Sequence, residues 1–288
     1  MERRRLGRTG HHSSVAILGG AAFWGTDPAV TKEAFDSALG AGVNHLDVAP
    51  QYGRAQELLG PFVPAVRGDL FVACKTLRRD PDGVRAQLDE SLRLLGCEYF
   101  DLYQLHAVTD VEDLDARRGA VEAVLEARDD GRCHFAGITG HGLDTPAAQL
   151  EALRRYDLDT VMFPVSPQLW SDTSYRRDAE ALLQLAEERD LGVMAIKAVA
   201  ARPWAGRPPT TTTWYEPYTS REEVARGVGF ALSTPGVQAV CTPSDLRLVS
   251  LLLELLDTDA PVGLSPDARA AASAATRHEP SIFPMPAA

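Results

Sequence analysis

Four side chains that can take part in proton transfer stand at or just beyond the ends of short apolar runs: Asp47, Tyr52, Lys75 and His106. A phenol has a pKa of about 10, too high to release its proton readily at neutral pH. A neighbouring ammonium lowers the pKa of a phenol, and a carboxylate paired with the ammonium keeps it charged. These residue types predict that Tyr52 is a general acid, tuned by Lys75, which pairs with Asp47. His106 is predicted to orient a carbonyl oxygen.

Each of these residues has a simpler interpretation when taken alone. Asp47, with Pro50 and Gly53 after it, is typical of a turn. A single lysine at a strand end is commonly solvated, and a single histidine is commonly a satisfied core residue. Their joint occurrence at three neighbouring strand ends favours chemistry. A proton delivered to a carbonyl oxygen needs a partner that attacks the carbon, and a hydride from a bound cofactor is the natural complement.

Short apolar runs alternate with longer amphipathic stretches along most of the chain. The predicted strands are residues 14–18, 43–48, 70–75, 100–106, 133–139, 160–165, 192–198 and 237–242. The predicted helices are residues 30–41, 53–65, 81–95, 117–130, 144–155, 174–189, 221–233 and 244–256. Eight strands alternating with eight helices predict a (β/α)8 TIM barrel, here as one α/β domain over residues 1–288.

The alternative fold is an open, doubly wound sheet, which often begins with a glycine-rich dinucleotide turn. The stretch "ILGGAAFWG" (17–25) lacks the G-x-G-x-x-G spacing of that turn. The barrel also explains the site, because catalytic residues of barrels lie at the C-terminal ends of adjacent strands, about 4.8 Å apart. Asp47, Lys75 and His106 end the second, third and fourth predicted strands, so they are expected to meet at one mouth.

Two segments fall outside the alternation. The first twelve or so residues are expected to form a hairpin that plugs the bottom of the barrel. The long connection 201–220 follows the seventh strand and is rich in proline, threonine and aromatic residues. Loops of this length are usually functional or disordered, and the aromatics favour an ordered lid. Arg202 and Arg207 are candidates to reach a bound pyrophosphate from this lid.

Composition limits the classes of partner. The chain has a net charge of −11 and a pI near 5.1, so it offers no general basic surface for nucleic acid or an anionic membrane. No run approaches the length of a membrane span, and the basic N-terminus is not followed by the apolar segment of a secretory leader. The four scattered cysteines suit reduced thiols in the cytoplasm, and no spacing implies a metal site. The oligomeric state stays open.

The sequence resembles the aldo-keto reductases, which are NADPH-dependent (β/α)8 barrels. The stretches that carry the resemblance are "LGRTG" (6–10), "GVNHLDVAPQYGRAQELLG" (42–60), "FVACKT" (71–76) and "FDLYQLH" (100–106). The resemblance implies that Tyr52 is the proton donor, assisted by Asp47, Lys75 and His106. It also implies the cofactor NADP(H) and a small-molecule aldehyde or ketone as substrate, with the reverse reaction also available.

Three positions depart from the family pattern around the nicotinamide. Thr139 and Gly140 stand where the family often has Ser-Asn, and His141 follows them. Met162 replaces a glutamine. Ile196, with Lys197 after it, takes the place of a stacking aromatic. These departures identify the chain as a divergent member, in which Thr139, His141 and Lys197 are the candidate contacts to the cofactor.

The predicted phosphate site is "CTPSDLRLV" (241–249), which opens the last predicted helix with Ser244 at or near its N-terminus. Helix N-termini bind anions through unpaired N–H groups, and barrels often bind phosphate after their last strands. The guanidinium of Arg247 suits a 2′-phosphate. The simpler interpretation is a serine cap followed by a surface arginine.

The favoured hypothesis is therefore an NADPH-dependent oxidoreductase that interconverts carbonyls and alcohols. A barrel that senses nucleotides with little turnover is the alternative, which the departures around the nicotinamide support. Isomerase or lyase chemistry without a cofactor at the same mouth is a third possibility. The sequence does not identify the substrate, because the loops that shape its pocket cannot be read from their residues.

Overall fold

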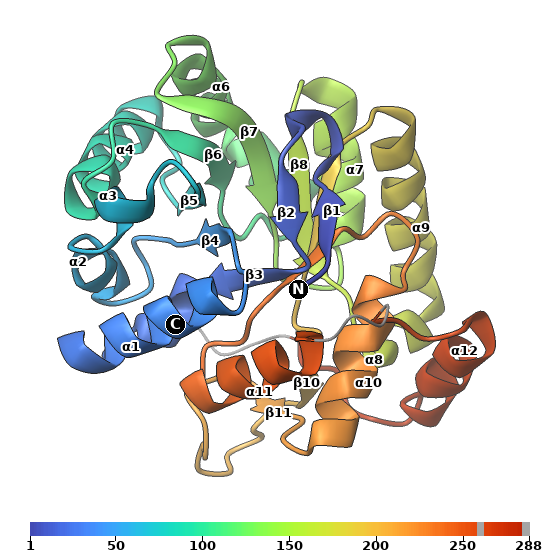
Figure 1. The fold of residues 1–288 in the computed structure, drawn as a ribbon. Coiled ribbons are helices and arrows are strands. Elements are labelled where there is room, and N and C mark those ends of the chain that lie inside the picture. The colour runs from blue at the N-terminus through green and yellow to red at the C-terminus, as the bar shows by residue number, and fades with distance from the viewer. Residues whose placement is uncertain (258–261, 284–288) are drawn as a thin grey trace.

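The computed structural model describes residues 1–257 and 262–283 and contains a closed ring of eight parallel strands (Figure 1). Each strand pairs with the next one along the chain, and the last pairs with the first, through Val240 opposite Ala16 and Cys241 opposite Ile17. The predicted TIM barrel is confirmed. Its strands are β3 (Ala16–Gly19), β4 (His45–Asp47), β5 (Phe71–Thr76), β6 (Phe100–Leu105), β7 (Cys133–Thr139), β8 (Thr160–Pro164), β9 (Gly192–Ile196) and β12 (Ala239–Cys241).

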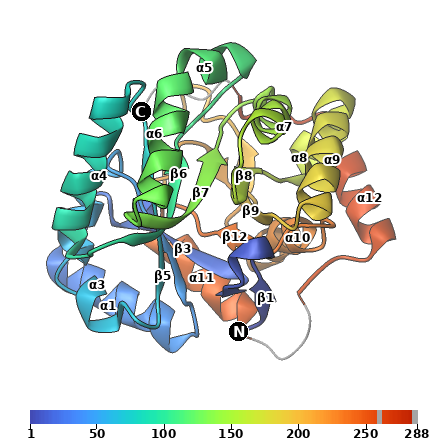
Figure 2. The same cartoon turned by 90° about the horizontal axis from the view of Figure 1, so that it is seen from above.

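Helices surround this ring on the outside, as the view in Figure 2 shows. They are α1 (Pro28–Gly40), α2 (Ala55–Leu59), α3 (Val63–Val66), α4 (Pro81–Leu95), α5 (Val111–Ala116), α6 (Arg118–Asp129), α7 (Thr145–Arg155), α8 (Pro167–Ser171), α9 (Thr173–Glu188), α10 (Arg221–Leu232), α11 (Leu246–Leu256) and α12 (Pro266–Ala275). None of the helices in these described ranges is long and apolar enough to cross a membrane. The four cysteines are free thiols.

Helix α4 illustrates how local signals set the helix bounds. Pro81 occupies its first turn, and the Asp80 carboxylate accepts a hydrogen bond from the Gly83 N–H at 2.7 Å, which caps the N-terminus. Gly96 ends the helix in the left-handed conformation, with φ of 64°. The apolar face packs on the barrel and includes Val84 and Leu88.

The helices of the structure differ from the predicted ones at four places. The single helix predicted over 53–65 is two short helices, α2 and α3. They are separated at Gly60, where any side chain would collide with the Leu94 carbonyl. The helices α5, α8 and α12 were not predicted. Two of them have at most six residues, and α12 is a run of mainly alanine that contains no large apolar residue.

The predicted hairpin at the bottom of the barrel is also confirmed. Strands β1 (Arg3–Arg5) and β2 (His12–Ser14) pair antiparallel, and the 3-10 turn η1 (Gly7–Thr9) lies between them. Leu6 is fully buried in the apolar interior of the barrel, and it packs directly over Gly192 at the start of β9. The hairpin thus covers the N-terminal end of the barrel, opposite the mouth.

The connection after β9 is ordered at its base. Strands β10 (Ala200–Arg202) and β11 (Glu216–Pro217) pair antiparallel and return the chain to the mouth. At the top of the connection, the ring of Trp214 lies 6.3 Å from that of Tyr52 and 6.1 Å from that of Trp24, which follows β3. The segment therefore lies over the barrel mouth, as a lid requires.

Candidate functional site

The structure brings Asp47, Tyr52 and Lys75 together at the C-terminal ends of β4 and β5. The Lys75 ammonium forms an ion pair with the Asp47 carboxylate, and both side chains are almost completely buried. The same ammonium donates a hydrogen bond to the Tyr52 hydroxyl at 3.3 Å and lies 5.1 Å from the centre of its ring. The arrangement holds the phenol beside a fixed positive charge.

The charge of this cluster follows from its burial and its contacts. Burial lowers the pKa of Lys75, but the Asp47 carboxylate outweighs that effect, so the pKa is raised and the ammonium stays charged. Burial raises the pKa of Tyr52 to about 12, and Lys75 offsets only part of the rise. Lys75 lowers the pKa of Tyr52 as expected, but loss of solvent acts more strongly than the ammonium, so the net shift is upward. Tyr52 keeps its proton at neutral pH.

His106, which follows β6, lies on the other side of Tyr52. Their ring centres are 5.8 Å apart and the rings are nearly perpendicular. Burial, together with the positive charges of Lys75 and Arg117, lowers the pKa of His106 well below its usual value. His106 is therefore a neutral imidazole, suited to hydrogen bonding and not to carrying charge.

Sequence reasoning missed three further contacts of the cluster. Gln104 Nε2 donates to Asp47 Oδ1 at 3.3 Å, and the Cys241 thiol at the end of β12 lies 3.9 Å from Asp47 Oδ2. Gln51 Oε1 lies 3.2 Å from His106 Nδ1, so this amide controls which ring nitrogen carries the proton. The signal for Gln104 was its position two residues before His106, on the same inward face of β6.

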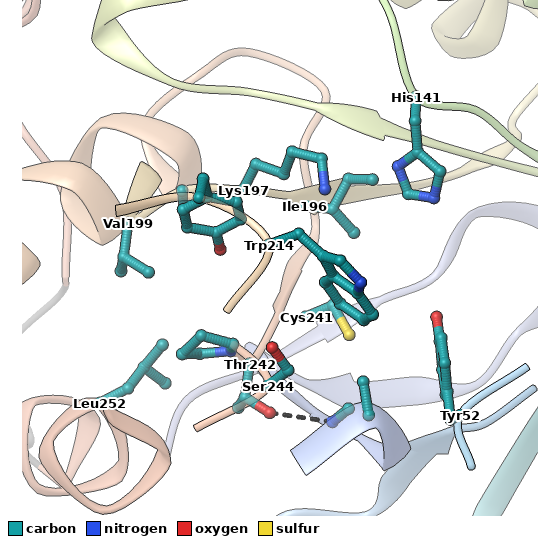
Figure 3. Close-up of a pocket in the computed structure, with 15 residues that line it drawn as sticks. Tyr52, His141, Ile196, Lys197, Val199, Trp214, Cys241, Thr242, Ser244 and Leu252 are labelled. Atoms are coloured by element: carbon teal, nitrogen blue, oxygen red, sulfur yellow. Dashed lines mark hydrogen bonds between the residues drawn. The ribbon is translucent and has the colours of Figure 1, made fainter. Parts of the chain in front are cut away.

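A pocket that is partly open to solvent extends from Tyr52 to the loop between β12 and α11 (Figure 3). The end of β9, the loop before α11, Leu252 of α11 and the lid residues Trp214 and Tyr215 line it. Three of the predicted cofactor contacts line this pocket: His141, Lys197 and Ser244. Its mixture of apolar walls and a few polar groups is typical of a small-molecule site.

One of these residues, His141, presents a polar atom without a partner among the described residues. His141 Nδ1 is buried and forms no hydrogen bond with the described part of the chain. Burial lowers the pKa of His141 well below its usual value, and nearby Lys197 contributes to that shift. An unpartnered buried polar atom is costly, so His141 fits a site that a polar ligand completes.

The region after β12 opens a helix with Ser244 near its N-terminus, as expected, but another residue caps the helix. Helix α11 begins at Leu246, and its cap is Asp245, whose carboxylate accepts the Arg247 N–H at 3.0 Å. Asp245 also forms an ion pair with the Arg247 guanidinium at 2.8 Å. Ser244 precedes the cap, and its hydroxyl donates to the Thr212 carbonyl of the lid at 3.1 Å. Ser244 therefore connects the lid to this loop and is not itself the helix cap.

The remaining candidates form contacts elsewhere. The hydroxyl of Thr139 accepts the Ala107 N–H at 3.2 Å, which fixes the chain just after His106. Arg202 and Arg207 were expected to face a bound pyrophosphate, but both pair with Glu216 within the lid. The carboxylate of Glu216 holds these guanidinium groups within the lid.

Comparison with known proteins places this geometry in a family. The profile of the aldo/keto reductase family matches residues 16–223. The uncharacterized oxidoreductase YqkF of Bacillus subtilis is 28% identical over 214 residues, which cover 69% of this chain and 65% of that protein. The aldo-keto reductase str7 of Strobilurus tenacellus is 28% identical over 196 residues, which cover 63% of this chain and 54% of that protein. The chain thus spans less than two thirds of the length of these curated relatives.

Solved structures support the fold. The holo form of an aldo-keto reductase from Bacillus halodurans superposes with a TM-score of 0.73 at 22% identity, covering 95% of this chain and 96% of that one. The barrel topology and the family match over most of the barrel agree with each other. This chain belongs to the aldo/keto reductase family.

Proposed function

We propose that the protein is an NADPH-dependent oxidoreductase that reduces a small-molecule aldehyde or ketone to an alcohol, or runs the reverse reaction. The observation that carries this proposal is the hydrogen bond from Lys75 to the Tyr52 hydroxyl, inside a buried ion pair with Asp47. An intact proton-donating cluster at the mouth favours turnover over a role limited to nucleotide sensing. The four free thiols support a reducing compartment, such as the cytoplasm.

The residues of the pocket fit a nicotinamide cofactor. The pocket extends from Tyr52 to the loop before α11. It is also lined by Lys197 and by His141, whose buried Nδ1 has no hydrogen-bond partner among the described residues. When bound, the cofactor supplies a hydride to the carbonyl carbon. We propose that His141, Lys197 and Ser244 hold it along the pocket and that the exposed Arg247 meets the 2′-phosphate. Thr139 supports the site by fixing the chain after His106.

Residues of the chain itself transfer the proton and stabilise the charges that result. Tyr52 delivers its proton to the carbonyl oxygen, and Lys75 stabilises the phenolate that remains. Because His106 is neutral, it does not compete with Tyr52 as an acid. To donate to the same oxygen it must carry its single proton on Nε2, with the Gln51 amide turned so that its NH2 group donates to Nδ1. The lid residue Trp214 lies against Tyr52 and limits access of water to this exchange.

The test is Tyr52→Phe, which keeps the ring and removes the transferable proton. Carbonyl reduction should fall by at least about 10²-fold, the scale of general acid catalysis, while the affinity for NADPH stays unchanged. Turnover is followed by oxidation of NADPH with a panel of aldehydes and ketones, and affinity by cofactor fluorescence. Tyr156→Phe, far from the mouth, is the matched control. Full activity in the Tyr52 variant would show that Tyr52 is not the general acid. Failure of the wild type to bind NADPH or NADH would refute the proposed oxidoreductase function.

A further inference from the structure

Lys197 is a buried lysine directed into the pocket. It follows β9 directly, and its φ of 62° lies in the left-handed region that a lysine rarely adopts. Only 7% of its surface is exposed. Figure 3 shows its ammonium inside the pocket, directed toward Ile196 and His141. A strained backbone that directs a charged side chain inward is typical of a functional site.

The Lys197 ammonium has no counter-charge. No residue in 1–257 or 262–283 forms an ion pair or a hydrogen bond with it, and its nearest aromatic contact is the Tyr215 ring, 5.3 Å away. Burial lowers the pKa of Lys197 to about 8. This differs from Lys75, whose ammonium is paired with Asp47. An unpaired buried ammonium is unfavourable unless a ligand supplies the negative charge.

The position of Lys197 identifies that ligand group. Among the 15 residues that line the pocket, Lys197 is the only lysine or arginine, and none is a carboxylate. It lines the same pocket as Tyr52, where the nicotinamide must react, and Ser244, near the expected adenosine end. The group of a dinucleotide that lies midway between its two ends is the pyrophosphate. Only three of the 29 basic residues of the chain are lysines, so a cation able to lose its proton is unusual here.

We infer that the Lys197 ammonium binds the pyrophosphate of the nicotinamide cofactor, and that cofactor binding at alkaline pH takes up a proton at this side chain. The inference rests on the proposed function and adds a specific anchor and a pH dependence to it. The bound anion stabilises the ammonium form, so a lysine that is partly neutral in the free protein becomes protonated in the complex.

The neighbours of Lys197 do not titrate in the same pH range. Burial raises the pKa of the Tyr215 hydroxyl and of the Cys241 thiol, so both stay protonated. Burial lowers the pKa of His106 and of His141 well below neutrality, so both are neutral above pH 7. A change in cofactor affinity between pH 7 and pH 9 is therefore attributable to Lys197.

The experiment compares wild type with Lys197→Met, and with Lys197→Gln in case the first variant does not fold. Lys32→Met is the matched control, because Lys32 is exposed and pairs with Asp36 on α1. Dissociation constants for NADPH and for ADP-ribose, which keeps the pyrophosphate but lacks the nicotinamide, are measured by calorimetry from pH 7 to pH 9.5. The binding enthalpy is measured in two buffers with different ionisation enthalpies, and the difference between the two values gives the number of protons taken up.

The Lys197 variants should bind both ligands about ten- to a hundredfold more weakly at pH 7, as expected for a lost charge-assisted hydrogen bond. Wild-type affinity should fall about tenfold from pH 7 to pH 9 with proton uptake, while the variants show neither effect. Unchanged ADP-ribose binding in the variants would overturn the pyrophosphate assignment, and a flat wild-type pH profile would overturn the proton linkage. If the wild type binds neither NADPH nor NADH, the proposed function fails first, which is a distinct result.

Discussion

Removing the charge of Lys197 should make the protein without cofactor more stable. A lysine has a pKa of 10.5 in an unfolded chain, whereas Lys197 has a pKa of about 8 in the folded protein. That difference corresponds to about 3 kcal/mol of destabilisation at neutral pH, where the side chain is charged in both states. The penalty is fully present below the folded pKa and disappears as the pH rises from about 8 through 10.5.

The assay is urea unfolding of wild type and Lys197→Met without cofactor, followed by tryptophan fluorescence and circular dichroism. The variant should be more stable by about 3 kcal/mol at pH 7 and by less than about 1 kcal/mol at pH 10. All other titrating groups are common to both proteins and cancel in the difference. A difference that does not change with pH would show that apolar packing, and not charge, is responsible. A variant less stable than wild type would refute the reasoning. The expected gain in stability of the variant follows a common pattern, in which residues that form a binding site lower the stability of the folded protein.

Three further perturbations follow from the structure. Lys75→Met should cost about 3–5 kcal/mol of folding free energy by leaving the Asp47 carboxylate buried alone, and addition of Asp47→Asn should recover much of it in urea unfolding. Arg247→Ala should weaken NADPH binding about ten- to a hundredfold more than NADH binding, and equal losses would place the 2′-phosphate elsewhere. Burial holds the pKa of His45 well below its usual value, so stability should fall as the pH drops below about 6.5, where the unfolded chain takes up a proton. His45→Gln should then shift the midpoint of acid unfolding to lower pH. An unshifted midpoint would show that His45 does not cause the loss of stability at acid pH.

The barrel could be predicted from the sequence because the signals for its strands and helices lie within short stretches of the chain. Each strand is a short apolar run, and each long helix repeats its apolar residues at a fixed spacing, so the alternation is readable without tertiary information. The same alternation placed Asp47, Lys75 and His106 at neighbouring strand ends. The contacts among Asp47, Lys75 and Tyr52 follow from parallel strands lying side by side.

The features that sequence reasoning missed depend on competition between effects of similar size. Whether Lys75 or burial dominates the pKa of Tyr52 depends on how completely the surroundings exclude water. Ser244 and Asp245 are both good helix caps, and the outcome depends on Thr212, which holds Ser244 from the distant lid. The lid arginines were assigned to a ligand because the sequence does not show that Glu216 lies within their reach.

The hairpin that closes the bottom of the barrel also has a consequence for synthesis of the chain. The guanidinium of Arg8 bonds Asp159 at 2.8 Å, and Gly7 lies against the backbone of Leu191, so the first residues attach to β8 and β9. The ring itself closes only when β12 pairs with β3. The end of β9 at Ile196 and the end of β12 at Cys241 are 45 residues apart, which take about 2–9 s to translate. We expect the hairpin to join the edges at β3 and β9 during that interval and so to hinder their pairing with other chains.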